Sequence, residues 1–174
     1  FPARLKDCGA HAFDELSYPG DSIKQEYKED ILVGYRWHDT KKIPALFPFG
    51  HGLSYTTFTY GKPVASAKTM AADGTLTVTV AVKNTGSIAG KEIVQLYVGD
   101  DKCSVLRPVK ELKHFAKVAL APGEEKSVTF TLTPDDLKFY DEASAAWKYE
   151  PGKFKAYVCA SSADVRGVVS FEMQ

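Results

Sequence analysis

The stretch Thr75-Leu76-Thr77-Val78-Thr79-Val80-Ala81-Val82 decides the fold class of this chain. Leu and Val residues occupy every second position, and Thr or Ala residues occupy the positions between them. Successive side chains of a β-strand point to opposite faces of its sheet. This alternation therefore predicts a strand with an apolar face turned inward and a polar face turned outward.

The same period of two recurs along the rest of the chain, at residues 92–98, 126–133, 154–158 and 165–171, and less regularly at 112–120. In the first of these runs we expect Val94, Leu96 and Val98 to face the core and Tyr97 to lie on the outer face. Turn sequences that contain Pro or Gly separate the runs, at 121–124, 133–136 and 150–153. A single helical turn is expected at 134–139, with Asp135 or Asp136 as its cap. Six or seven short strands with such turns predict an antiparallel β-sandwich.

The first 60 residues have a different composition. They hold five of the nine Tyr, four of the nine Pro and three of the four His, and Gly and Pro interrupt them repeatedly. Only short regular elements fit between such breaks. The apolar run Ile31-Leu32-Val33-Gly34-Tyr35 is the best candidate for a buried strand. We expect the segment as a whole to be a strap that lies on a larger body.

Length, charge and hydropathy exclude several classes of protein. The 174 residues fit one domain plus part of another, and the first residue, Phe1, suggests a piece of a longer chain. A net charge of zero and a pI near 7.1 argue against a nucleic-acid partner. No apolar run approaches the ~18 residues of a membrane span. Three cysteines do not make a disulfide framework.

No group of residues has the spacing of a catalytic or metal site. Adjacent acidic residues occur at 29–30, 100–101, 124–125, 135–136 and 141–142, and we expect solvated loops or helix caps there. The four histidines lack zinc-ligand spacing, and the three cysteines are scattered; they are His11, His38, His51, His114, Cys8, Cys103 and Cys159. For His51, between two glycines, a structural role is favoured over a site role. We therefore expect no catalytic residue, no metal ligand and no cofactor, and assign no substrate-binding residue.

The segment Tyr157-Val158-Cys159 is similar to the end of an immunoglobulin variable domain. That fold needs a partner Cys on an early strand and a Trp on the third. The strand at 76–82 has no Cys, and the strand at 92–98 has no Trp. The immunoglobulin interpretation therefore fails, while the sandwich architecture remains.

Longer motifs resemble one enzyme family. Residues 27–37 (YKEDILVGYRW) and 46–58 (LFPFGHGLSYTTF) closely resemble the C-terminal portion of family 3 glycoside hydrolases, the β-glucosidases. Later stretches resemble the fibronectin type III-like domain of that family, at 82–86, 94–98, 107–112, 120–124 and 139–141. One departure is Asp30, where the family usually has Gly, and its functional meaning stays open.

The resemblance implies a retaining β-glucosidase, acting on β-glucosides and in some members on β-xylosides. In that family the nucleophilic Asp belongs to an N-terminal barrel domain and the acid/base to the α/β sandwich domain that follows. Neither motif matches a position here. The resemblance implies that residues 1–50 are the tail of the α/β sandwich domain, 51–63 a connecting segment and 64–174 the fibronectin type III-like β-sandwich.

The expected partners are thus the N-terminal portion of the same enzyme and, through the assembled enzyme, a β-glucoside or oligosaccharide substrate. No nucleic acid and no membrane is expected. We also expect the loop at 107–111 to lie against the missing domains, with Arg107 in the interface. The alternative is a free-standing fibronectin-like module that binds a polysaccharide or a protein. A periplasmic or extracellular location is favoured over a cytoplasmic one, although unpaired cysteines also fit the cytoplasm.

Overall fold

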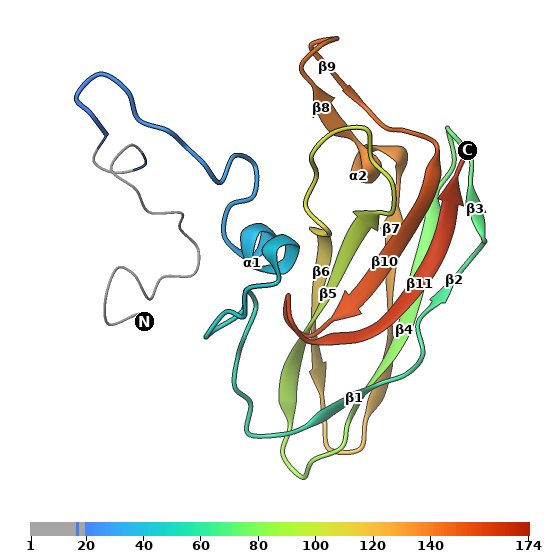
Figure 1. Cartoon of the computed structure of the whole chain (residues 1–174). Coiled ribbons are helices and arrows are strands. Elements are labelled where there is room, and N and C mark those ends of the chain that lie inside the picture. The colour runs from blue at the N-terminus through green and yellow to red at the C-terminus, as the bar shows by residue number, and fades with distance from the viewer. Residues whose placement is uncertain (1–16, 18–19) are drawn as a thin grey trace.

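Two β-sheets, antiparallel except for one short parallel pair, pack face to face and form the body of the molecule (Figure 1). The computed structural model describes residue 17 and residues 20–174. The first sheet holds β1 (Phe58–Tyr60), β2 (Val64–Ala65), β4 (Leu76–Asn84) and β7 (Glu125–Leu132). The second holds β3 (Thr69–Met70), β5 (Gly90–Asp100), β6 (Glu111–Leu120), β10 (Gly152–Cys159) and β11 (Val165–Met173). The predicted mainly-β sandwich is confirmed.

Strand pairing gives each sheet a defined order. In the first sheet β7 pairs with β4 along its length, so β1 and β2 share the other edge of β4. The second sheet has the order β3-β11-β10-β5-β6, and its short β3 is parallel to β11. A separate hairpin of β8 (Phe139–Asp141) and β9 (Ala146–Lys148) stands at the end of the sandwich away from β1 (Figure 1).

The core lies between the two sheets. Along β4 every second residue is buried, from Leu76 to Asn84, as the alternation predicted. The apolar side chains of β4 pack against inward residues of β5 and β10, including Leu96 and Phe154. Burying a side chain of this size stabilises the fold by roughly 1.5–3 kcal/mol. Most of the apolar residues that the alternation predicted to face inward therefore lie in the core.

Two short helices complete the described structure: α1 (Tyr35–Lys41) and α2 (Pro134–Leu137). The predicted turn at α2 is confirmed, with Thr133 as its N-cap; of the two predicted acidic residues, Asp136 completes the capping box at position N3. The Asp136 carboxylate accepts hydrogen bonds from the backbone N–H and the hydroxyl of Thr133, which forms a capping box. Neither helix has the length and apolar character needed to cross a membrane.

The strand predicted at residues 31–35 is wrong. Leu32 is buried, but Ile31 and Val33 are exposed, and the backbone there has no sheet partner. Gly34 has a φ of 63°, which ends the extended run, and α1 begins at the next residue, Tyr35. A short apolar run fits a strand or the approach to a helix equally well, because its periodicity cannot separate the two.

The prediction that Tyr97 lies on the outer face of its strand is confirmed, although that face is covered. Tyr97 is on the outer face of β5, yet it is fully buried. Residues 94–99 of β5 are buried on both faces. The cover on the outer face comes from α1 and the segment that follows it, so residues 35–50 of the strap lie against the second sheet (Figure 1).

Candidate docking surface

The outer face of β5 carries a buried polar pair. The hydroxyl of Tyr97 donates to Oε1 of Gln95 at 2.6 Å, and Nε2 of Gln95 donates to the carbonyl of Ala160 at 3.0 Å. Burial raises the pKa of the Tyr97 phenol, so this hydroxyl stays a donor at neutral pH. The pair satisfies polar groups that the covering strap would otherwise leave without hydrogen bonds.

Tyr35, the first residue of α1, binds the strap to two strands of the sheet. Its ring lies edge-on to Tyr97, with centroids 5.6 Å apart, and tilted against Phe49 at 5.3 Å. Its hydroxyl accepts a hydrogen bond from the backbone N–H of Leu112 at 2.9 Å. The helix is therefore held by an aromatic cluster and by a hydrogen bond to β6.

A buried ion pair holds the same helix from the side of the β5–β6 loop. Nζ of Lys110 is 2.5 Å from Oδ2 of Asp39, and it lies 5.5 Å from the centre of the Tyr97 ring. Both side chains are nearly buried, at 9% and 14% exposure. The backbone N–H of Val109 donates to Oγ1 of Thr40 at 3.1 Å. The loop that the sequence placed against a neighbouring domain thus contacts the strap itself.

The turn after Phe49 passes close to the sheet. The backbone N–H of Ser162 donates to the carbonyl of Phe49 at 2.8 Å. Gly50 has a φ of 82°, and a Cβ there would lie 2.2 Å from Nε2 of Gln95. Only glycine combines this backbone angle with so close an approach. His51, by contrast, is exposed, and its backbone N–H donates to the carbonyl of Pro48 at 2.9 Å. Its ring lies 5.7 Å from the ring of Phe47, between centroids.

The strap turns many apolar side chains toward solvent. We call the following residues the docking face: Ile23, Tyr27, Val33, Leu46, Phe47, Leu53 and Tyr55, each at least 66% exposed. Beside them lies a hollow of about 570 Å³. It is lined by Gly34 and α1, by residues 42–45 and 47–49, and by Ser162 and Ala163. These exposed apolar side chains make the segment a candidate interaction surface.

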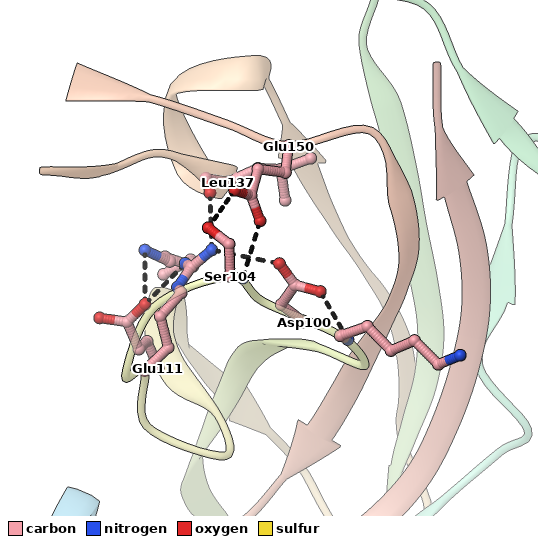
Figure 2. Close-up of polar contacts among 8 residues, drawn as sticks. Asp100, Ser104, Glu111, Leu137 and Glu150 are labelled. Atoms are coloured by element: carbon pink, nitrogen blue, oxygen red, sulfur yellow. Dashed lines mark hydrogen bonds and ion pairs between the residues drawn. The ribbon is translucent and has the colours of Figure 1, made fainter. Parts of the chain in front are cut away.

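Arg107 lies inside the chain, contrary to the expected interface position. Its side chain is 8% exposed. The guanidinium donates to the carbonyl of Leu137 and to Oε2 of Glu111, both at 3.0 Å (Figure 2). It also lies 5.5 Å from the centre of the Phe139 ring. Burial raises the pKa of Glu111, but Lys113, Arg107 and Arg36 outweigh it and lower the pKa below its usual value.

Two of the acidic residues expected in solvated loops are buried. The side chain of Asp100 is 4% exposed, with Nη1 of Arg107 3.6 Å from its Oδ2. Asp141 is 8% exposed, and its carboxylate accepts hydrogen bonds from Ser144 and is paired with Lys148. Asp135 and Asp101 are exposed and paired with lysines, as that interpretation expected. The alternation of apolar and polar residues did not predict that Asp100 and Asp141 are buried.

Among the described residues, His38 and His114 have polar neighbours within the fold, whereas Cys103 and Cys159 are free thiols. Nδ1 of His38 is 3.0 Å from the carbonyl of Ile43, and Nε2 of His114 is 3.2 Å from Oδ1 of Asp136. Cys159 is a free, fully buried thiol, and burial raises its pKa to about 12. Cys103 is a free, partly exposed thiol. His11 and Cys8 lie outside the described residues.

Comparison with known proteins agrees with this architecture. The family model for the fibronectin type III-like domain matches residues 92–162. A β-glucosidase of Bacteroides ovatus, BoGH3A, is 66% identical over 99% of this chain and 23% of its own length. The thermostable β-glucosidase B of Acetivibrio thermocellus is 49% identical over 95% of this chain and 21% of its own.

Solved structures give the same result. The β-glucosidase DesR of Streptomyces venezuelae, crystallised with D-glucose, superimposes with a TM-score of 0.84 at 41% identity, over 95% of this chain and 21% of its own. A family 3 β-glucosidase of Bifidobacterium adolescentis gives a TM-score of 0.83 at 38% identity, over 90% and 23%. The chain thus spans less than a quarter of the length of these relatives. Over nearly its whole length it corresponds to the C-terminal ~20% of family 3 β-glucosidases, including their fibronectin type III-like domain.

Proposed function

We propose that this chain is the C-terminal part of a retaining β-glucosidase that hydrolyses terminal β-D-glucosidic, and also β-xylosidic, bonds. In this proposal the chain contributes stability and domain docking, while both catalytic carboxylates belong to N-terminal domains of the same enzyme. The observation that carries the proposal is the two-sided strap. Its inner side is bonded to the sandwich through Tyr35 and Asp39, and its outer side exposes the docking face.

The docking face would pack against the remainder of the α/β sandwich domain. Residues 1–50 would be the tail of that domain, 51–63 the connecting segment and 64–174 the accessory sandwich. Exposed apolar side chains such as Leu53, at 94%, and Phe47, at 67%, would become buried in that interface. The buried contacts between α1 and β5 would then fix the orientation of the sandwich relative to the catalytic domains.

The test is reconstitution of the enzyme from two chains. The protein is produced as this 174-residue chain and as a second chain that holds the preceding domains, and the hydrolysis of an aryl β-glucoside is measured for each and for the mixture. We expect no turnover by this chain alone and recovered turnover in the mixture. Turnover that co-purifies with the 19.1 kDa species would contradict the proposal.

Matched variants test the docking face itself. Leu53→Asp and Phe47→Asp place a charge on the proposed interface and should reduce the recovered activity and the co-elution of the two chains. Ile88→Asp places the same charge at a site that is 54% exposed in the turn between β4 and β5, and should leave both unchanged. Equal behaviour of the three variants would count against docking through the strap.

The alternative, a free-standing module that binds a polysaccharide, has one observation in its favour. Tyr140 of β8 and Trp147 of β9 are cross-strand neighbours, with ring centroids 5.7 Å apart, and are 50% and 66% exposed. Planar aromatic rings can stack on the apolar faces of sugar rings. Retention of this chain on an insoluble β-glucan, lost in Trp147→Ala, together with no reconstitution, would favour this alternative over the first function.

A further inference from the structure

Three potential metal ligands converge beside the loop that joins β5 to β6. Asp100 ends β5, Cys103 lies in the loop, and Glu150 lies just before β10. One carboxylate oxygen of Asp100, one of Glu150 and Sγ of Cys103 all lie within 4.8 Å of one another. Figure 2 shows that the carboxylates of Asp100 and Glu150 and the hydroxyl of Ser104 converge. The pairing of β5 with β10 thus brings together Asp100 and Glu150, which are 50 positions apart in the chain.

The carboxylate of Asp100 is incompletely satisfied. Its side chain is 96% buried, and its Oδ2 accepts no hydrogen bond, although its Oδ1 accepts one from the backbone N–H of Lys102 at 3.0 Å. Nη1 of Arg107 is 3.6 Å from Oδ2, beyond hydrogen-bond distance, and donates instead to the carbonyl of Leu137. Arg107 offsets the charge of Asp100, but a buried Oδ2 that accepts no hydrogen bond still costs free energy, and a metal ion bound to that oxygen would remove the cost.

We propose that Asp100, Cys103 and Glu150 form a Zn²⁺ site, with a water molecule as the fourth ligand. Zn²⁺ accepts thiolate and carboxylate ligands in tetrahedral geometry, whereas Mg²⁺ and Ca²⁺ prefer oxygen ligands alone. Metal–ligand distances of about 2.0–2.3 Å place the ligand atoms roughly 3.5 Å apart, so the site contracts slightly on binding. The Cys103 thiol gives its proton to solvent as the Zn–S bond forms.

The metal would fix the β5–β6 loop. Ser104 already bonds Glu150 through its backbone N–H at 3.0 Å and through its hydroxyl. Zinc adds a second link between this loop and the start of β10. Farther along the same loop, Val109 and Lys110 hold α1. Arg107 opposes a cation at this position, but its charge is offset by Glu111, to which it donates at 3.0 Å. The zinc site therefore stabilises the loop that positions the strap.

The experiment uses the metal-free 174-residue chain carrying Cys8→Ser, so that Cys103 and the buried Cys159 are its remaining thiols. Zn²⁺ is titrated by calorimetry, and Co²⁺ by absorption spectroscopy. We expect one equivalent of Zn²⁺ to bind and to raise the melting temperature, and Co²⁺ to show a thiolate-to-metal charge-transfer band. Ca²⁺ should leave the melting temperature unchanged.

Ligand variants decide the outcome. Cys103→Ser and Glu150→Gln should each weaken Zn²⁺ binding by at least about 10-fold. Asp101→Asn, which removes an exposed neighbouring carboxylate, should leave it unchanged. Cys103 is partly exposed, and Cys103→Ala provides a second variant whose metal-free fold is checked by circular dichroism. Unchanged affinity in folded Cys103 variants, no cobalt–thiolate band, or an equal effect of Ca²⁺ would each overturn the site. None of these measurements depends on glucosidase activity.

Discussion

The ring of Tyr35 meets the ring of Tyr97 edge-on, with centroids 5.6 Å apart and ring planes at 80°. Tyr97 belongs to β5 of the sandwich. Tyr35 is the first residue of α1, which lies in the strap before the sandwich in the chain. Such aromatic pairs contribute about 0.5–1.5 kcal/mol beyond the area they bury. The strap and the sandwich are therefore joined by side-chain packing as well as by the connecting chain.

The hydroxyl of Tyr35 provides the first prediction. Tyr35→Phe removes the acceptor of the Leu112 N–H and should lower the free energy of unfolding by about 1 kcal/mol. Tyr35→Ala also removes the ring and should cost more. Urea denaturation measures both. Tyr55→Phe, at a side chain that is 96% exposed, is the control and should leave the stability unchanged.

The Lys110–Asp39 ion pair predicts a non-additive result. Lys110→Met leaves the Asp39 carboxylate buried without its cation and should destabilise the chain by about 3 kcal/mol. The double variant Lys110→Met/Asp39→Leu should recover part of that loss, because neither charge is then buried. Denaturation of the two single variants and the double variant gives the coupling energy. Strictly additive effects would contradict a direct interaction between the two side chains.

Substitutions of Gly50 and Gly52 by Ala test how closely the strap approaches the sheet, with Gly52→Ala as the control. Gly50→Ala introduces a Cβ 2.2 Å from the Gln95 side chain at a φ of 82°, and should destabilise the chain by roughly 1–3 kcal/mol. Gly52→Ala meets no atom within 4 Å and should be close to neutral. Thermal unfolding compares them. Similar melting temperatures for the two variants would mean that the strap does not approach the sheet at Gly50.

Glu92 predicts a pH-dependent difference. Burial raises its pKa in the folded state, and Asp164 adds to this effect, against the hydrogen bond from Tyr60 and the charge of Arg166. Stability linked to a raised pKa is present below the unfolded value of about 4.3 and is lost as pH rises through the folded value. Relative to the wild type, Glu92→Gln should therefore gain melting temperature between pH 4 and pH 8.

The control for this measurement is Glu125→Gln, at an exposed position of β7. Its melting temperature relative to the wild type should not change with pH in the same interval. If the melting temperatures of Glu92→Gln and the wild type changed with pH in parallel, the Glu92 carboxyl would have the same pKa in the folded and the unfolded chain, against the prediction.

Local patterns were sufficient for the sandwich. The alternation at 76–82 predicted the buried face of β4, the turn sequences predicted where strands end, and Pro134 with two acidic residues predicted α2. These features depend on neighbouring residues, which the sequence displays directly. The motifs that resemble family 3 β-glucosidases likewise lie in order along the chain, and the comparisons confirmed that assignment.

What only the tertiary structure decided is the cover on the outer face of β5. The strand pattern placed Tyr97 on the outer face, and its burial there depends on Tyr35, 62 positions earlier. Lys110 and Asp39 were unremarkable charges until the loop and α1 met. The sequence by itself determined which faces of the strands are apolar, because side-chain direction alternates locally. It could not determine which segment covers a mixed face, because that depends on contacts between residues far apart in the chain.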